Sequence, residues 1–144
     1  MSERHEALAC PHRPPCPGCP RFGEPGISPT AYAALEALAR TYDLPGVPVV
    51  FGATNAFRLR ARLAIRGRQG APKLGMFQLG THRVVAIPNC IVQHPLINRA
   101  AAVVRRALVD ADVTPYSEAT HLGLARYLQV VVERSSGSAQ LVIV

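Results

Sequence analysis

From Phe57 onward, apolar and basic side chains alternate with a period of two, and this pattern constrains the fold more than any other feature of the chain. The apolar positions are Phe57, Leu59, Ala61, Leu63 and Ile65. The positions between them hold Arg58, Arg60, Arg62, Ala64 and Arg66. Because successive side chains of a strand point to opposite faces of a sheet, the segment is expected to form a strand with one face in a core and one cationic face.

The rest of the chain supplies further strands and two helices. Strands are expected at residues 74–78, 83–87, 126–134 and 141–144. Turns are expected at 67–72 and 79–81, where glycine and proline gather. Apolar residues at helical spacing predict a helix over 29–42, capped by Ser28, and a second over 95–109, where Pro95 suits a first helical turn. The sequence therefore predicts an α+β fold, in which one or two helices pack on an antiparallel sheet.

Four cysteines stand in an unequal grouping, at Cys10, Cys16, Cys19 and Cys90, so that the fourth follows the third by about seventy residues. A C-x2-C pair lets two thiolates bind one site from a single turn, and a proline after each of the first three stiffens the segment. The three-plus-one grouping favours a [4Fe–4S] cluster. A structural zinc site is the main alternative, although such sites more often use two C-x2–4-C pairs, and unligated thiols are a third.

The charge of the chain is strongly positive and unevenly spread. The net charge is +7, and no acidic residue lies between Asp43 and Asp110, where ten basic residues fall. A stretch of one sign and of this length indicates a polyanionic partner such as RNA. The candidate RNA-binding residues are Arg58, Arg60, Arg62, Arg66 and Arg68 on the strand, with His82 and Arg83 at a turn. The alternative is a solvated outer face without a ligand.

The ends and the composition set further expectations. No apolar run approaches the ~20 residues of a membrane-spanning helix. The residues before Cys10 lack the basic start and apolar stretch of a secretory signal, so we expect a cytoplasmic protein with reduced thiols and no membrane partner. Three parts are expected: a Cys/Pro-rich cluster-binding loop at 1–28, a helix and linker at 29–48, and an α+β RNA-recognition domain at 49–144. The last part stops inside an expected strand and is interpreted as truncated.

Three motifs resemble RNA uracil-C5 methyltransferases of the iron–sulfur-containing bacterial class that methylates uridine in 23S ribosomal RNA. They are Cys-Pro-His-Arg-Pro-Pro-Cys-Pro-Gly-Cys at 10–19, Phe-Arg-Leu-Arg-Ala-Arg-Leu at 57–63, and the run 74–90 followed by His-Pro-Leu-Ile-Asn at 94–98. The resemblance covers nearly all of the chain and implies that Cys90 is the fourth cluster ligand. It also implies a cluster with a structural role that helps to hold RNA.

In that family a cysteine thiolate attacks C6 of a flipped uridine, and S-adenosylmethionine then methylates C5. The methyl-donor domain and the catalytic cysteine of the family lie beyond the residues that match this chain. If all four thiolates bind a cluster, none is left as a nucleophile. We therefore expect no catalytic residue here and leave open whether the chain is an enzyme, with S-adenosylmethionine used only by a full-length relative.

Two other functions compete with this interpretation. The chain can be a stand-alone RNA-binding module in which a [4Fe–4S] or zinc site is a structural staple. It can also be a small iron–sulfur redox protein, but a redox carrier has no need of a row of arginines. The expected partner is RNA, with ribosomal RNA favoured over transfer RNA by the resemblance.

Overall fold

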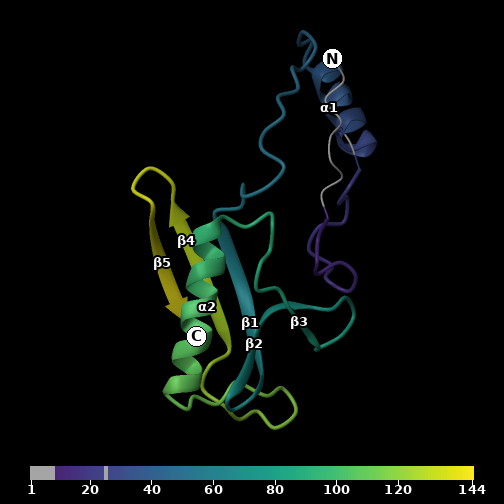
Figure 1. Cartoon of the computed structure of the whole chain (residues 1–144). Coiled ribbons are helices and arrows are strands. Elements are labelled where there is room, and N and C mark those ends of the chain that lie inside the picture. Colours follow the sequence, from purple (N-terminus) through teal and green to yellow (C-terminus); the bar gives the residue numbers. More distant parts are fainter. Residues whose placement is uncertain (1–8, 25) are drawn as a thin grey trace. The chain divides into compact units, whose positions relative to one another are not determined.

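The computed structural model describes residues 9–24 and 26–144, which fall into two compact units (Figure 1). In its described part, the first unit comprises residues 21–24 and 26–52. The second unit comprises residues 9–20 and 53–144 and contains all four cysteines. Within the described residues, no helix has both the length and the apolar character needed to cross a membrane.

The first unit is built around helix α1, Pro29–Thr41. Ser28 caps its start, because the Ser28 hydroxyl accepts a hydrogen bond from the Ala31 N–H at 3.5 Å. The chain leaves the helix at Tyr42 and continues to residue 52 without regular structure. The helix expected over 29–42 is therefore confirmed, together with its capping serine.

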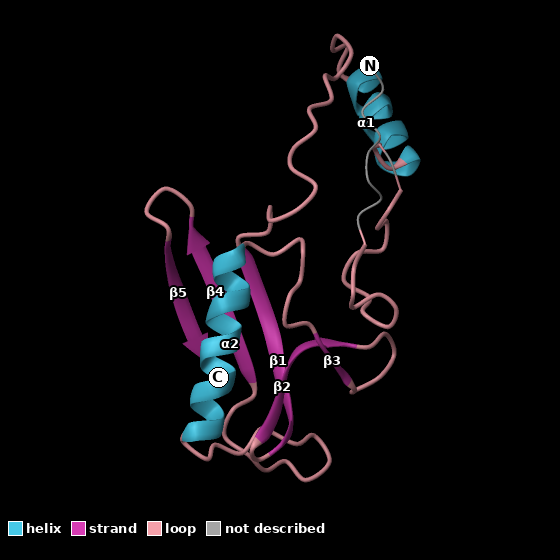
Figure 2. Cartoon of the chain, in the orientation of Figure 1, coloured by secondary structure: helices cyan, strands magenta, loops and turns pink. Residues whose placement is uncertain are grey.

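The second unit is a five-stranded antiparallel sheet with one helix against it (Figure 2). Its elements are β1 Arg60–Arg68, β2 Ala71–Phe77, β3 Val84–Ala86, α2 Pro95–Asp110, β4 Tyr127–Glu133 and β5 Ser138–Ile143. The strands lie in the order β3-β2-β1-β4-β5, so β1 is central and pairs with β2 and β4. The α+β fold and the antiparallel sheet predicted from the sequence are confirmed.

The hydrophobic core lies between α2 and one face of the sheet (Figure 1). The helix contributes Ile97, Ala101, Val104 and Leu108. The two central strands contribute Ala61, Leu63, Ile65, Leu128, Val130 and Val132. These strand residues alternate with the polar and basic positions, as the period of two requires. The opposite face of β1 and β4 is consequently left for the arginines.

The first hairpin differs from its expected form. The turn expected at 67–72 is only two residues long, because Arg68 already pairs with Ala71 across Gln69 and Gly70. Gly70 has a φ of 75°, the left-handed conformation that such a turn requires and that glycine adopts without strain. Pro72 therefore lies inside β2. The composition of the segment suggested a longer loop, whereas strand pairing extends almost to the tip.

Gly75 shows why a glycine interrupts β2. A Cβ atom built on Gly75 would overlap the backbone carbonyl of Val85 on the neighbouring strand. The missing side chain lets β3 approach β2 closely at this point, next to the pair formed by Gly75 and Ala86. The β2–β3 hairpin then carries residues 78–83 beyond the edge of the sheet. This hairpin positions two of the predicted RNA-binding residues.

Candidate cluster site and nucleic-acid interface

The loop of residues 9–20 belongs to the same unit as the sheet, so the three amino-terminal cysteines share a unit with Cys90. Cys16 and Cys90 are half-buried and both pack against the hydrophobic core. Cys10 and Cys19 are also half-buried, and none of the four forms a disulfide. The fold therefore gathers all four candidate ligands in one unit, although about seventy residues separate Cys19 from Cys90 in the sequence.

Local hydrogen bonds shape the cysteine loop. The Cys16 N–H donates to the His12 carbonyl at 2.8 Å, and the Arg13 guanidinium donates to the Cys19 carbonyl. The Gly18 N–H points at the Cys16 sulfur, with 3.4 Å between the nitrogen and Sγ. Backbone N–H groups that donate to a cysteine sulfur stabilise its thiolate, and such bonds tune iron–sulfur sites.

Gly18 also allows the loop to sit against β2. A Cβ atom at Gly18 would lie 3.1 Å from the sulfur of Met76 and 3.4 Å from Sγ of Cys16. The first distance is tighter than ordinary van der Waals contact, so a side chain here would force the loop or Met76 to move. The absence of a side chain at Gly18 therefore lets the cysteine loop lie against Met76 of β2.

Cys90 lies in the connection between β3 and α2. Hydrogen bonds from that connection and from α2 fix its backbone carbonyl. The Asn98 side chain on α2 donates to the Cys90 carbonyl at 3.1 Å, and the Gln93 N–H donates to the same oxygen at 3.3 Å. The residues before α2 are joined to the start of β1 as well, through the Arg58 N–H and the Val92 carbonyl at 2.9 Å. This framework fixes the backbone that presents the fourth thiol.

Burial and the charges of the other three cysteines and of Arg58 all affect the pKa of Cys19. Burial raises the pKa of the Cys19 thiol above its usual value, and the negative charge of Cys90 raises it further. The positive charge of Arg58 opposes this shift, while Cys10 and Cys16 add to it. Gathering thiolates in one place is thus unfavourable unless a cation compensates them, which is the situation that metal binding resolves.

The donor set consists of four thiols, which both iron–sulfur clusters and structural zinc sites use. Among the described residues, no three His, Cys, Asp or Glu side chains are grouped so as to hold one metal ion. His12 Nε2, in the same loop, is buried without a hydrogen-bond partner in the described structure. An orphaned donor beside the cysteines fits a site that gains acceptors, such as sulfides, on loading.

The five predicted arginines do not share one environment. Arg60 and Arg62 are exposed on the face of β1 opposite α2, and Arg68 is exposed at the end of the strand. The Arg62 guanidinium lies 4.3 Å from the centre of the Tyr127 ring, in cation–π contact. Arg58 precedes the strand, is half-buried, and lies near enough to Cys19 to affect its pKa.

Arg66 is the largest departure from the expected exposed row. It is 8% exposed, and Nη1 donates to the carbonyls of Ile65 and Arg126 at 2.8 and 2.9 Å. Its Nη2 is 2.5 Å from Oε1 of Glu118, in an ion pair. Burial acts to raise the pKa of Glu118, but the hydrogen bond and charge of Arg66, with the charges of Arg126 and His82, lower it overall. Arg66 therefore anchors the segment that carries Glu118, and its predicted RNA contact stays a prediction.

His82 and Arg83 meet Arg66 around one open cleft of about 1100 Å³. They reach it from the β2–β3 hairpin, and Lys73 reaches it from β2. Three of the seven predicted RNA-binding residues thus come together, from parts of the sequence that are not adjacent. The other four lie elsewhere on the unit, and no RNA contact of any of the seven is tested by the geometry alone.

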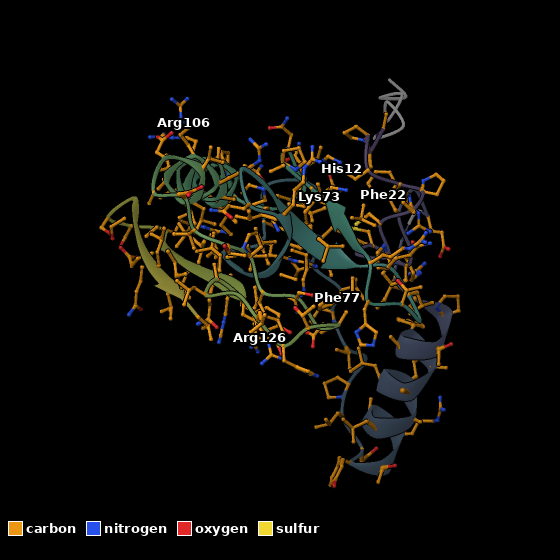
Figure 3. All side chains as sticks on the ribbon, turned by 90° about the horizontal axis from the view of Figure 1, so that it is seen from below. His12, Phe22, Lys73, Phe77, Arg106 and Arg126 are labelled. Atoms are coloured by element: carbon orange, nitrogen blue, oxygen red, sulfur yellow. The ribbon has the colours of Figure 1, made fainter. Side chains whose placement is uncertain are left out.

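The sequence did not single out the aromatic residues that accompany the arginines. Tyr116, Tyr127 and Phe77 surround the Arg66 guanidinium at 5.2 to 5.4 Å from their ring centres. In Figure 3, Phe77 and Arg126 lie on one side of the sheet, while Arg106 extends from α2 on the other. Tyr127 alternates with the buried Leu128, which marked it as facing away from the core. The sequence could not predict that Tyr127 contacts Arg62, because β1 and β4 pair across a long stretch of chain.

Known proteins similar to this chain are RNA methyltransferases. No protein-family model matches the chain. It is 38% identical over 142 residues to an uncharacterised RNA methyltransferase of Protochlamydia amoebophila, covering 96% of this chain and 35% of the relative. An uncharacterised RNA methyltransferase of Geobacter sulfurreducens is 29% identical over 143 residues, with 94% of this chain and 29% of the relative covered.

A relative with a named target is also similar. The 23S rRNA (uracil(1939)-C(5))-methyltransferase RlmD of Chromohalobacter salexigens is 31% identical over 121 residues, which cover 74% of this chain and 26% of the relative. The chain spans about a third or less of the length of the relatives it matches.

Proposed function

We propose that this chain, which belongs to the RNA methyltransferase family and spans about a third of the length of its relatives, is the part of such an enzyme that holds an iron–sulfur cluster and recognises RNA. The complete protein would be an S-adenosylmethionine-dependent RNA uracil-C5 methyltransferase acting on ribosomal RNA. The similarity to a relative named as a 23S rRNA uracil-C5 methyltransferase supports this reaction and this substrate. The segment itself would bind and orient RNA and would not transfer the methyl group.

The gathering of the four cysteines in one unit carries the proposal. Cys10, Cys16, Cys19 and Cys90 would hold the cluster, which when bound supplies four iron–thiolate bonds that tie the loop to the sheet. The amino-terminal loop has few apolar residues of its own, so such a tie offsets the entropy lost when the loop is ordered. With all four thiols engaged, the 144 residues contain no further cysteine to attack uridine.

The face of the sheet opposite α2 supports the RNA role. Arg60 and Arg62 are exposed there, and the ring of Tyr127 lies beneath the Arg62 guanidinium. Guanidinium groups recognise phosphate through paired hydrogen bonds and also stack on unpaired bases. The net charge of +7 makes binding to a polyanion favourable and dependent on salt.

A stand-alone RNA-binding module with a structural metal site is the second candidate. The strong basic charge and the cysteine site suit it equally, since neither requires a catalytic domain. The DNA that follows the Val144 codon distinguishes the two. A continuing frame with a glycine-rich loop and another cysteine supports the methyltransferase segment, and a stop codon followed by an unrelated gene supports the module.

Anaerobic purification of the chain tests the cluster. We expect a brown protein that contains about four iron and about four sulfide per chain. Replacing Cys19 by Ser should lower both, since this removes one of the four ligands. A colourless protein with one zinc per chain would refute the cluster and favour the zinc alternative.

RNA binding to the same protein tests the second half of the proposal. The double variant Arg60→Ala/Arg62→Ala should bind RNA more weakly and with a smaller dependence on salt than the parent. The control double variant Arg99→Ala/Arg106→Ala removes two exposed cations from α2, which packs on the other face of the sheet, and should bind like the parent. Equal loss in both variants would mean that only net charge matters and that this face has no special role.

A further inference from the structure

The cleft beside the β2–β3 hairpin is a cavity of about 1100 Å³, larger than a single phosphate needs and comparable with sites for small organic ligands. Its walls come from β1, β2, the β2–β3 hairpin, the segment before β4 and Pro15 of the cysteine loop. The polar and charged side chains that line it are Arg66, Lys73, Gln78, His82, Arg83, Ser117 and Glu118. A concave, cationic site of this size admits one nucleotide of a single strand more readily than a stiff duplex.

The charges at the rim of the cleft are free to bind a ligand. Lys73, His82 and Arg83 are exposed, and the described residues offer neither the Lys73 ammonium nor the Arg83 guanidinium a hydrogen-bond or ion-pair partner. Glu118, the carboxylate in the cleft, is already neutralised by Arg66 at 2.5 Å and by Arg126 at 3.6 Å. The rim therefore keeps an unbalanced positive charge.

The wall of the cleft also contains a buried side-chain nitrogen without a partner. Arg66 lines the cleft and is more than nine-tenths buried, yet its Nε has no hydrogen-bond partner within the described residues. Buried donors are nearly always paired, and an unpaired one calls for a partner that the protein itself does not supply. The Nε atom is closed to solvent, so a ligand oxygen in the cleft would reach it only if the wall moved.

We propose that this cleft binds one unpaired nucleotide of the RNA, with its phosphate between Lys73 and Arg83 and its base against the His82 ring. The proposal rests on the RNA-recognising role proposed above and names the subsite and the form of RNA that it takes. The His82 ring stands edge-on to Phe77 at 6.4 Å between ring centres, which holds it at the cleft while leaving it exposed. Aromatic and imidazole rings in such positions stack on splayed bases.

A pair of double variants of equal charge tests the proposal. Lys73→Ala/Arg83→Ala removes two cations from the cleft, and Arg99→Ala/Arg106→Ala removes two exposed cations from α2. Binding of a single-stranded RNA of about 12 nucleotides, a length within the range of known single-strand sites, is measured by fluorescence anisotropy across a salt series. We expect the cleft variant to bind about tenfold more weakly and its salt slope to fall by about 0.7, for the one phosphate contact that is lost. The α2 variant should stay within about twofold of the parent.

Three further measurements distinguish a nucleotide site from a site for any anion and from general RNA binding. The parent should bind the duplex of the same sequence more weakly than the single strand. Uridine 5′-monophosphate, but not the same concentration of inorganic phosphate, should shift the NMR signals of residues 78–83 and 116–119. Equal weakening in both double variants, or equal shifts with inorganic phosphate, overturns the nucleotide site but leaves RNA recognition standing. A parent chain that binds no RNA at all overturns the proposed function, and this inference with it.

Discussion

Of the four proposed cluster ligands, Cys90 is the one whose loss should cost the most stability, because a cluster would join it to the cysteine loop across a long stretch of chain. A cluster shared by Cys19 and Cys90 closes a loop of about seventy residues. If the cluster persists in the unfolded chain, the entropy of that closure stabilises the fold by roughly 4 kcal/mol. If unfolding releases the cluster, its binding free energy adds to stability instead and exceeds this value. About 4 kcal/mol is thus the smallest effect expected.

The substitution Cys90→Ala also has a cost that does not depend on metal. The Cys90 side chain is half-buried against the core, and removing its sulfur should cost about 1 kcal/mol, as for other small deletions from a core. Four urea titrations separate the two effects: parent and variant, each with the cluster loaded under anaerobic conditions and each after removal of the iron by a chelator. The difference between parent and variant should be about 5 kcal/mol or more when the parent is loaded. It should fall to about 1 kcal/mol between the iron-free proteins.

Two results would refute this reasoning. A variant that keeps the full iron and sulfide content would show that Cys90 is not a ligand. A stability difference of the same size with and without iron would show that Cys90 acts only by packing. The exposed Leu122, which is 69% exposed and lies outside the core, offers a matched control. Leu122→Ala should change neither the iron content nor the stability by more than about 0.5 kcal/mol.

Three further predictions follow from the same structure. Leu128→Ala deletes a side chain that is fully buried in β4, and should lower the free energy of unfolding by about 2–5 kcal/mol in urea titrations; a loss below about 1 kcal/mol would contradict the core assignment. Glu133 accepts hydrogen bonds from Ser135 and Ser136, which lower its pKa from 4.5 to about 2. Its carboxylate therefore stabilises the fold above pH 4.5, and this contribution is lost as the pH falls through about 2. Ser135→Ala removes the hydroxyl that donates to Oε1 of Glu133 at 2.6 Å and should raise that pKa in an NMR titration, and an unchanged value would exclude a contribution from this bond. Gly75→Ala should speed amide hydrogen exchange in β3, because its Cβ overlaps the backbone there; unaltered protection would show that the strands can adjust.

The parts of the fold that the sequence predicted well are those decided within a few residues. The alternation of Ala61, Leu63 and Ile65 and the apolar positions of α2 depend on local periods, and both match the buried positions in the structure. Phe57, which was expected on the same face, precedes β1 and is 46% exposed. The ends of the elements were less accurate, because pairing decides them. β1 begins at Arg60 and not at Phe57, since its register with β4 starts where Arg60 meets Val131. Glycine and proline at 67–72 suggested a loop that pairing with β1 turns into a strand.

The candidate site divides in the same way. The loop with three cysteines could be recognised as a candidate metal-binding segment from its spacing. The resemblance supported Cys90 as the fourth ligand. The meeting of these two parts depends on tertiary structure that no local pattern encodes. The cleft was not foreseen either, although His82 and Arg83 were. Its Lys73, Tyr116 and Glu118 come from different elements, and only the order of the strands and the path of the chain before β4 bring them together.

Arg62 and Arg66 show how little spacing alone says about function. They occupy equivalent positions on β1, four residues apart and on the same face, so a period of two cannot distinguish them. The two arginines differ in the segments that lie next to them. Arg62 lies over Tyr127 and stays exposed, whereas the segment with Glu118 covers Arg66. Substituting Arg62 should therefore affect RNA binding with little change in stability, because its guanidinium remains open to solvent. Substituting Arg66 should release the Glu118 segment first, and any loss of RNA binding would follow from that, since the same segment forms one wall of the cleft.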